Sequence, residues 1–393
     1  MSAAPLAGLL VVDLSRHLPG PLVARLLADL GARVVKLEEP ELGDPVRQAP
    51  PARQGRSLLA TELLGGVESA AADLKRPGGR DLLARLLERA DVLLESFRPG
   101  TLARLGFPLD ELRRRHPRLV VCSISGFGQD GPAAGRAGHD LTYQAVAGTL
   151  ASPMSMPGIP AADLLGAWSA VSSVLAALVA RERGGEGCAI DASLLDGAVH
   201  GNLVQWAAAA GGAESVAGDL TGALPCYNLY RSRDGRGVAL ALLESKFWKR
   251  FCALTGRRDL RRVQYDKSPI ARRRVAELIG SRNAADWQAL FVAEDLPAEV
   301  VRSPVEALAD PQVVARGVVA SGADGLPRPA FPARFDGERP PRCGDLPALG
   351  ADTRRLLAEL GSPLAGASHL ARRRAGVAPR WSWRSLRWRL GSG

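Results

Sequence analysis

Leu9-Leu10-Val11-Val12-Asp13-Leu14 is the stretch from which the fold of this chain can be worked out. It is a short apolar run of the kind that forms a buried strand. The next segment, Pro21 to Leu30, has the apolar spacing of a helix that ends at Gly31, and Ala32 to Leu37 is a second apolar run. A strand, a helix and a strand in close succession predict a βαβ unit, and therefore a parallel sheet.

The same alternation of apolar runs and helical patterns continues through the first half of the chain. It predicts two helices and two strands, namely helix Arg80–Arg89, strand Asp91–Leu94, helix Leu109–Arg115 and strand Leu119–Ile124. Two longer helices follow, at Leu164–Arg183 and Ser193–Ala210. We therefore expect an α/β fold whose large domain contains a Rossmann-like parallel sheet.

Composition shifts at Gly211-Gly212 and around Gly222 to Pro225 mark a domain boundary. The strand-like run Gly237–Leu242 and the helical segments after it indicate a smaller α+β domain. A proline-rich stretch, 325–346, is interpreted as a return crossing, so that the large domain is built from both chain ends. The expected parts are the first part of the large domain (1–195), a helix and linker (196–224), the small domain (225–316), a linker (317–332), the return to the large domain (333–379) and a basic tail (380–393).

The composition is that of a globular protein, with 46% hydrophobic and 23% charged residues. We find no apolar stretch as long as a membrane span and no signal peptide at the start, so we expect no membrane span and a cytoplasmic location. The five cysteines lie far apart and have no metal-ligand spacing. We therefore expect neither a metal site nor a prosthetic cofactor.

The net charge of +10 is concentrated at the C-terminus, because no acidic residue follows Glu359 whereas seven arginines do. Trp381, Trp383 and Trp388 lie among these arginines. Such a tail is compatible with a phosphate-rich ligand, a protein partner, a membrane surface or an extension without a role. Because the rest of the chain is only weakly basic, we do not expect nucleic acid as a partner.

A glycine-rich turn, Gly126-Phe127-Gly128-Gln129-Asp130-Gly131, follows the strand predicted at 119–124. It formally matches a dinucleotide-binding pattern, but Pro132 and the residues after it do not begin a helix. We interpret the glycines instead as allowing the backbone to turn tightly beside a bulky group.

His139 and Asp163 are the candidate acid–base residues. A neutral imidazole and a carboxylate that face each other across a substrate could each take or give a proton, and together they could invert a carbon next to a carbonyl. Taken alone, His139 is equally compatible with a surface or capping role. Asp163, just before the predicted helix, is equally compatible with a helix N-cap.

Short motifs spread over residues 5 to 378 resemble, in order, the family III CoA-transferase superfamily. The matching segments are Leu18–Pro21, Leu27–Ala32, Val34–Glu38, Asp73–Lys75, Phe97–Gly100, Ser125–Gln129, Gly138–Asp140, Ala162–Leu164, Asp191–Asp196, Ala307–Gln312 and Ala315–Gly317.

Within this superfamily the chain is similar to the α-methylacyl-CoA racemase branch. That branch has the Gly-His-Asp run seen at Gly138–Asp140, and a glutamate before a Lys-Phe-Trp run, as Glu244 stands here. The resemblance implies that His139 and Asp163 are the two acid–base groups and that Glu244 orients the imidazole. The transferase branch instead uses the carboxylate at position 163 as a nucleophile, and it usually lacks a histidine at position 139.

The implied activity is a racemase or epimerase that inverts the α-carbon of a 2-methylacyl-CoA thioester through an enolate. Backbone amides near Gly138 to Asp140 would stabilise the enolate oxygen. Asp163 would need desolvation to act as an acid near neutral pH. The alternatives are a CoA-transferase that works through an Asp163 acyl anhydride, and a binding protein that has lost catalysis.

The resemblance also implies contacts with coenzyme A, which is part of the substrate. The expected contacts are Ala72, Asp73, Leu74 and Lys75 on the adenine side, Ser96, Phe97, Arg98 and Arg104 near the nucleotide and its phosphates, and also Gly138, Asp140 and Tyr143. Glu39 departs from the family, which often has an arginine at that position, so a carrier-bound thioester is an alternative substrate.

Members of the family form intertwined homodimers in which each chain threads through a ring made by the other. The segments 210–224 and 317–332 fit such a crossing. In a dimer of this kind, Glu244 of one chain would complete the site that contains His139 and Asp163 of the other.

Overall fold

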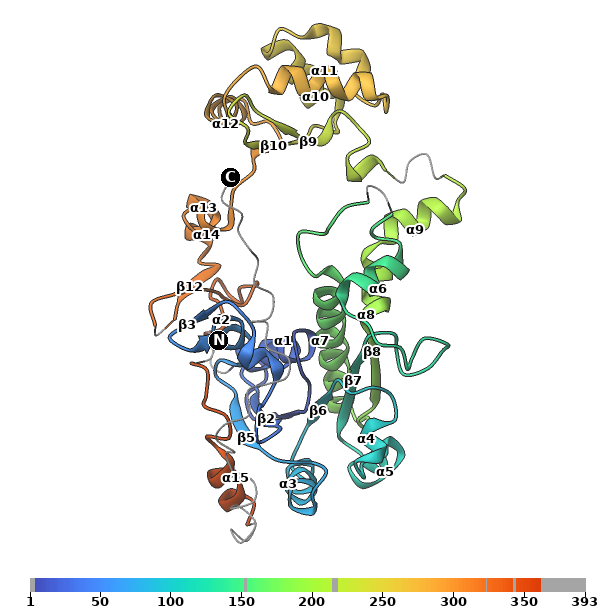
Figure 1. Ribbon diagram of the computed structural model, residues 1–393, viewed down its shortest axis with the longest axis vertical. Helices are drawn as coiled ribbons and strands as arrows, with labels where there is room; N and C mark the ends of the chain where they lie inside the picture. The colour runs from blue at the N-terminus through green and yellow to red at the C-terminus, as the bar shows by residue number, and fades with distance from the viewer. Residues whose placement is uncertain (1–3, 152–153, 214–217, 323, 342–343, 362–393) are drawn as a thin grey trace, which may run out of the picture. The chain divides into compact units, whose positions relative to one another are not determined.

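The computed structural model describes residues 4–151, 154–213, 218–322, 324–341 and 344–361 (Figure 1). The chain forms two compact units. The large unit comprises Met1–Ala147, Ile159–Ala198 and Gly317–Gly393, and the small unit comprises Gly148–Gly158 and Val199–Arg316. The large unit thus takes its residues from both halves of the chain. The basic tail lies outside the described residues.

A six-stranded sheet forms the centre of the large unit. Its strand order is β5-β2-β1-β6-β7-β8, and every neighbouring pair is parallel. The strands are β1 (Leu10–Asp13), β2 (Arg33–Glu38), β5 (Glu68–Ala71), β6 (Val92–Glu95), β7 (Val120–Ser125) and β8 (Ala189–Ser193). This arrangement confirms the α/β fold, although β5 and β8 were not predicted.

The helices of the large unit cover this sheet and connect its strands. They are α1 (Pro19–Asp29), α2 (Leu58–Leu64), α3 (Pro77–Leu87), α4 (Thr101–Arg104), α5 (Leu109–Arg115), α6 (Asp140–Ala147), α7 (Ala161–Glu182), α8 (Leu194–Gly201, which runs into the small unit) and α15 (Thr353–Glu359). Two short antiparallel pairs, β3 (Ala52–Arg53) with β4 (Arg56–Ser57) and β12 (Val319–Ser321) with β13 (Pro327–Pro329), complete the unit, together with a 3₁₀ turn at Pro45–Gln48.

The C-terminal helix α15 protects the edge strand β5. The backbone N–H of Ser69 donates to Asp352 Oδ2 (2.9 Å), and that of Ala71 donates to Thr353 Oγ1 (3.0 Å). Leu356 is buried in the same apolar cluster as the inward residues of the sheet. An edge strand is a site of unwanted pairing unless it is covered, and here the return of the chain covers it.

Helix α7 is long and apolar enough to span a membrane by length and composition, and it is the one such helix in the described part of the chain. The expectation that no apolar stretch reaches that length was therefore wrong. In the structure α7 contacts α1, β7 and β8, and it buries Ala167, Ala170, Val171 and Val174. Packing within the large unit thus covers one part of its apolar surface, whereas Leu165, Trp168 and Val179 are exposed.

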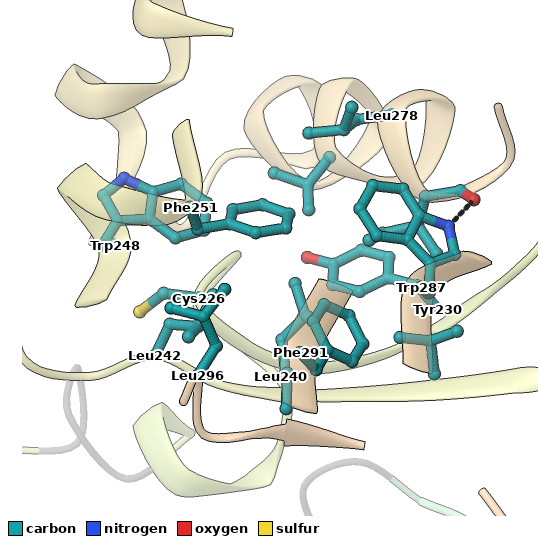
Figure 2. Packing of buried hydrophobic residues seen from close by; sticks show 14 of the residues in the cluster. Cys226, Tyr230, Leu240, Leu242, Trp248, Phe251, Leu278, Trp287, Phe291 and Leu296 are labelled. Carbon is teal, nitrogen blue, oxygen red and sulfur yellow. Dashed lines mark hydrogen bonds between the residues drawn. The ribbon is translucent and has the colours of Figure 1, made fainter. Parts of the chain in front are cut away.

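The small unit contains a three-stranded antiparallel sheet, in the order β11-β10-β9, and several helices. Trp248, Phe251, Trp287 and Phe291 form its aromatic core (Figure 2). The indole N–H of Trp287 donates to the carbonyl of Ile279 (2.8 Å), so a large apolar ring is buried without leaving its polar atom unpaired. The elements are α9 (Leu203–Ala210), β9 (Tyr227–Arg231), β10 (Gly237–Ala241), α10 (Ser245–Leu254), α11 (Pro269–Ile279), α12 (Ala284–Ala293), β11 (Ala298–Val300), α13 (Pro304–Leu308) and α14 (Pro311–Arg316), with 3₁₀ turns at Asp219–Thr221 and Arg258–Val263.

Two of the differences between predicted and observed helices bear on the site or on the division into units. The segment predicted as one helix, Ser193–Ala210, is divided into α8 and α9 at Asn202, whose backbone (φ −95°, ψ 20°) departs from the helical region. Helix α7 begins at Ala161, after Pro160, rather than at Leu164. Asp163 is therefore a residue of the first turn and not an N-cap.

Candidate active site

A cavity of about 340 Å³ lies in the large unit, at the carboxyl end of the parallel sheet. Its wall includes segments that directly follow β1 and β6, the end of β7, and both His139 and Asp163. In open parallel sheets this edge is where ligands bind, because the loops after neighbouring strands converge there. The two acid–base candidates thus belong to one cavity.

Asp140 connects the two candidates. It follows His139 at the start of α6, and its Oδ1 accepts the backbone N–H of Asp163 (3.1 Å) in the first turn of α7. The amide of Gln144 donates to its other oxygen (2.7 Å). The sequence predicted Asp140 as a ligand contact, but Asp140 does not line the cavity. In the structure it holds the first turn of α7 by its hydrogen bond with Asp163.

The backbone of His139 is held by Thr142. The N–H of His139 donates to Thr142 Oγ1 (3.1 Å), and that hydroxyl donates to the carbonyl of His139 (2.7 Å). The imidazole is exposed and lines the cavity. The His139 amide, one of the groups expected to stabilise an enolate oxygen, is therefore already hydrogen-bonded within the protein.

Asp163 has a perturbed carboxyl group. Burial raises its pKa to about 7, with a further contribution from the negative charge of Asp140. The N-terminal turn of α7 favours an anion at this position, but the loss of solvent outweighs it. Both the protonated and the ionised forms are therefore populated near neutral pH.

Tyr143 explains two glycines of the loop. A Cβ at Gly126 would lie 2.4 Å from the hydroxyl oxygen of Tyr143, and a Cβ at Gly138 would lie 2.5 Å from its ring. The ring also makes an edge-on contact with Phe127 (5.0 Å between centroids). Burial raises the pKa of Tyr143 to about 12, with smaller contributions from the negative charges of Asp163 and Asp140. The bulky group expected beside the glycine turn is this phenol.

Three arginines line the cavity, of which the sequence predicted one. Arg98 lies there with Ser96 and Phe97, as expected from the resemblance. Arg16 and Arg136 were missed. Arg16 could have been found from sequence, because it comes soon after β1 and so belongs to the carboxyl edge of a parallel strand.

Gly138 and Tyr143, two further predicted contacts, also line this cavity, whereas residues 72–75 and Arg104 do not. Ala72, Asp73, Leu74 and Lys75 follow β5, and β2 and β1 separate that strand from β6 in the sheet. The N–H of Lys75 donates to Asp73 Oδ1 (3.0 Å), and the side chain of Lys75 is exposed. Arg104 is also exposed, and its guanidinium donates to Thr101 Oγ1 (2.7 Å). A ligand that touched both groups would have to extend along the sheet edge.

Glu244 belongs to the small unit, where it precedes α10. Its carbonyl accepts the N–H groups of Phe247 (3.0 Å) and Trp248 (3.2 Å), and its side chain is exposed and makes no capping hydrogen bond. The carbonyl of the preceding residue, Leu243, accepts from the amide of Gln264 and the hydroxyl of Tyr265. The backbone on both sides of Glu244 is thus fixed while its carboxylate remains available.

His17 is a cavity residue that the sequence reasoning missed. Its backbone N–H donates to Asp44 Oδ1 (3.1 Å), and Asp44 in turn pairs with Lys36 (3.1 Å). Lys36 is fully buried and also pairs with Asp13 (3.0 Å). Burial alone would lower the pKa of Lys36, but these two carboxylates raise it above its ordinary value. The loop after β1 therefore rests on a buried cluster of charges.

Other reactive groups are few. Cys122, Cys188, Cys226 and Cys252 are free thiols, and Cys343 lies outside the described residues. Within the described ranges there is no cluster of three or more His, Cys, Asp or Glu side chains placed to hold a metal ion.

This fold and this site are those of an α/β enzyme, and comparisons with known proteins identify its family. The model of CoA-transferase family III matches residues 6–353. The chain is 34% identical to the succinate–glutarate CoA-transferase of Agrobacterium fabrum, with 91% of this chain and 96% of that protein covered. It is 31% identical to the α-methylacyl-CoA racemase of Homo sapiens, with 91% and 93% covered. A solved CAIB/BAIF family structure from Brucella suis is 28% identical, has a TM-score of 0.77, and covers 91% of this chain and 99% of its own.

The chain belongs to CoA-transferase family III, and it is an enzyme of the superfamily of CoA-transferases and acyl-CoA racemases. The names of its relatives are divided between these two activities. Family membership therefore defines the fold and the general class of substrate, whereas the reaction has to be argued from the site.

Proposed function

We propose that this enzyme is a racemase or epimerase that inverts the α-carbon of a 2-methylacyl-CoA thioester. The observation that supports the proposal most directly is that His139 and Asp163 line the same cavity. An inverting enzyme needs one group that removes the α-proton and a second that delivers a proton to the opposite face.

The protonation states fit this scheme. In one direction the Asp163 carboxylate takes the proton from C2, the electron pair of the C–H bond moves toward the thioester oxygen, and His139 delivers a proton to the other face. In the reverse direction the two residues exchange these functions. Because the pKa of Asp163 is about 7, the enzyme can start in either state near neutral pH.

Coenzyme A would extend away from the cavity along the sheet edge. In this proposal Arg98, with Ser96 and Phe97, holds the phosphate end of the pantetheine, and the Ala72–Lys75 segment and Arg104 contact the nucleotide. A thioester on a protein carrier is the alternative form of the substrate. A coenzyme A substrate also agrees with the cytoplasmic location expected from the sequence.

We also propose an intertwined homodimer in which Glu244 of one chain orients His139 of the other. Coexpression of His139→Ala and Glu244→Ala chains tests this arrangement, because a mixed dimer would contain one site with both residues intact. Random assembly would then restore about a quarter of the wild-type sites. If Glu244 acts within its own chain, the mixture will be as inactive as each variant alone.

Deuterium exchange distinguishes the proposal from its alternatives. Incubation of a 2-methylacyl-CoA with the enzyme in deuterium oxide, without an acceptor acid, should place deuterium at C2 and scramble its configuration. His139→Ala should abolish the scrambling of configuration. If exchange is absent and coenzyme A instead moves to added succinate or glutarate, the enzyme is a transferase with Asp163 as nucleophile, as the 34% identity to a succinate–glutarate CoA-transferase favours. Neither reaction with a range of thioesters would indicate a binding protein.

A further inference from the structure

The proposed reaction creates negative charge on the thioester oxygen, and this charge needs hydrogen-bond donors. Stabilisation of such an oxygen is often the largest single contribution to catalysis. The backbone N–H of His139 already donates a hydrogen bond to Thr142 Oγ1. Among the side-chain donors of the cavity that the proposed mechanism does not use are Ser125 and His17.

Ser125 is the last residue of β7 and lines the cavity. Its side chain is only 8% exposed, and its hydroxyl has no hydrogen-bond partner among the described residues. A buried hydroxyl without a hydrogen-bond partner is unfavourable, and most such groups in native proteins are satisfied. A ligand that accepts a hydrogen bond at this position would supply the missing partner.

His17 stands in an unfavourable backbone conformation beside His139. Its φ is 70°, in the left-handed region that residues other than glycine rarely adopt. The hydrogen bond to Asp44 and the buried Lys36 beneath it hold the loop in this shape. Strain of this kind persists where the surroundings impose it, and it is concentrated at functional sites. Here it places an imidazole on the cavity wall.

We propose that Ser125 and His17 donate hydrogen bonds to the thioester oxygen of the substrate and stabilise the enolate. This inference rests on the proposed function. The proton from C2 goes to Asp163 or His139, the electron pair moves onto the oxygen, and the two donors keep their protons throughout.

The charges around His17 agree with this assignment. Its pKa is lowered, chiefly by burial and also by the positive charges of His139, Arg16 and Lys36, while Asp44 acts in the opposite direction. A neutral imidazole still carries one N–H and can donate it without transferring a proton.

Paired variants test the two donors. Ser125→Ala and His17→Leu remove a donor, whereas Ser125→Thr and His17→Gln retain one, and His116→Gln is the control because His116 lies outside the cavity. The substrate is 2-methylpropanoyl-CoA, whose α-proton exchange in deuterium oxide is followed by mass spectrometry. We expect each donor-removing variant to lower kcat about 100-fold with little change in KM, and each conservative variant to recover most of the loss. The double variant should lose less than the product of the single effects, because both donors act on one oxygen.

A second measurement does not depend on turnover. The infrared carbonyl band of bound 2-methylpropanoyl-CoA, labelled with ¹³C at C1, should lie at lower frequency on the wild-type enzyme than on Ser125→Ala or His17→Leu. Unchanged kcat and an unchanged carbonyl band in both variants would overturn the inference. A wild-type enzyme that shifts the band but exchanges no deuterium would retain the two donors and reject the racemase proposal.

Discussion

Replacing Asp163 by asparagine should stabilise the protein at alkaline pH. Asparagine has nearly the shape of a protonated aspartic acid but cannot ionise. The ordinary pKa of an aspartate is near 3.9, whereas that of Asp163 in the folded protein is raised to about 7 by burial and by Asp140. The folded protein therefore binds a proton between about pH 4 and pH 7 that the unfolded chain has released.

The sign of the effect follows from this difference. As pH rises from 4 to 7, the native state loses stability relative to the unfolded chain. Above pH 7 the full free-energy cost of ionising the buried Asp163 is present. A pKa difference of about 3 corresponds to at most about 4 kcal/mol, which solvent screening of the partly exposed side chain reduces to roughly 1–3 kcal/mol. Asp163→Asn should remove this cost at pH 8 and have little effect near pH 4.5.

Scanning calorimetry of wild type and variant at equal protein concentration measures the effect. An increase in Tm of roughly 2–8 °C at pH 8, shrinking toward zero at pH 4.5, is expected for a unit of this size. Asp110→Asn is the matched control, since Asp110 also lies in the first turn of a helix but is exposed. A Tm difference that is the same at both pH values would refute the reasoning, because it would show that the carboxyl of Asp163 ionises normally.

Three further variants test the surroundings of the site. Gly126→Ala places a Cβ 2.4 Å from the hydroxyl oxygen of the buried Tyr143 and should lower the free energy of unfolding by about 1–3 kcal/mol. Gly135→Ala is the control, because a Cβ there lies in open space and should cost much less. Equal urea midpoints for the two variants would contradict the close contact between Gly126 and Tyr143. Asp140→Asn removes a charge that raises the pKa of Asp163. In a plot of the deuterium-exchange rate against pH, the acidic limb should therefore move below pH 7 but stay above pH 4. An upward shift would contradict the assigned effect of Asp140. Lys36→Met leaves two buried carboxylates without their cation and should lower the free energy of unfolding by about 3–5 kcal/mol, seen as a lower urea midpoint. An unchanged midpoint would show that the charge cluster does not stabilise the fold.

The parts of the fold that sequence predicted well are those set by local patterns. The apolar runs of β1 and β2 and the helix between them are visible because a buried parallel strand needs nearly every residue to be apolar. Helix α5 was predicted with the bounds that it has, 109–115. Strand β8 was missed because Asp191 interrupts its apolar character, and only its pairing with β7 makes it a strand.

The site was predicted to the extent that its residues share recognisable motifs. His139 and Asp163 stand in such motifs, and the structure places both on one cavity. His17 could not be predicted in the same way, because its conformation depends on Asp44 and Lys36, which come from separate segments. Its position soon after β1 was nevertheless a signal, since parallel strands present their following loops at one edge.

The environment of Asp163 bears on the choice between the two reactions of the family. A nucleophilic carboxylate must be ionised to attack, so a pKa of about 7 would leave about half of the enzyme unreactive at neutral pH. A proton shuttle uses both forms, because each direction of the inversion starts from a different one. Burial of Asp163 would therefore cost acyl transfer about a factor of two in reactive enzyme, and it would give inversion the protonated form from which one direction starts. In the proposed inversion, the histidine on the same cavity would deliver the proton to the second face, a step that acyl transfer does not need.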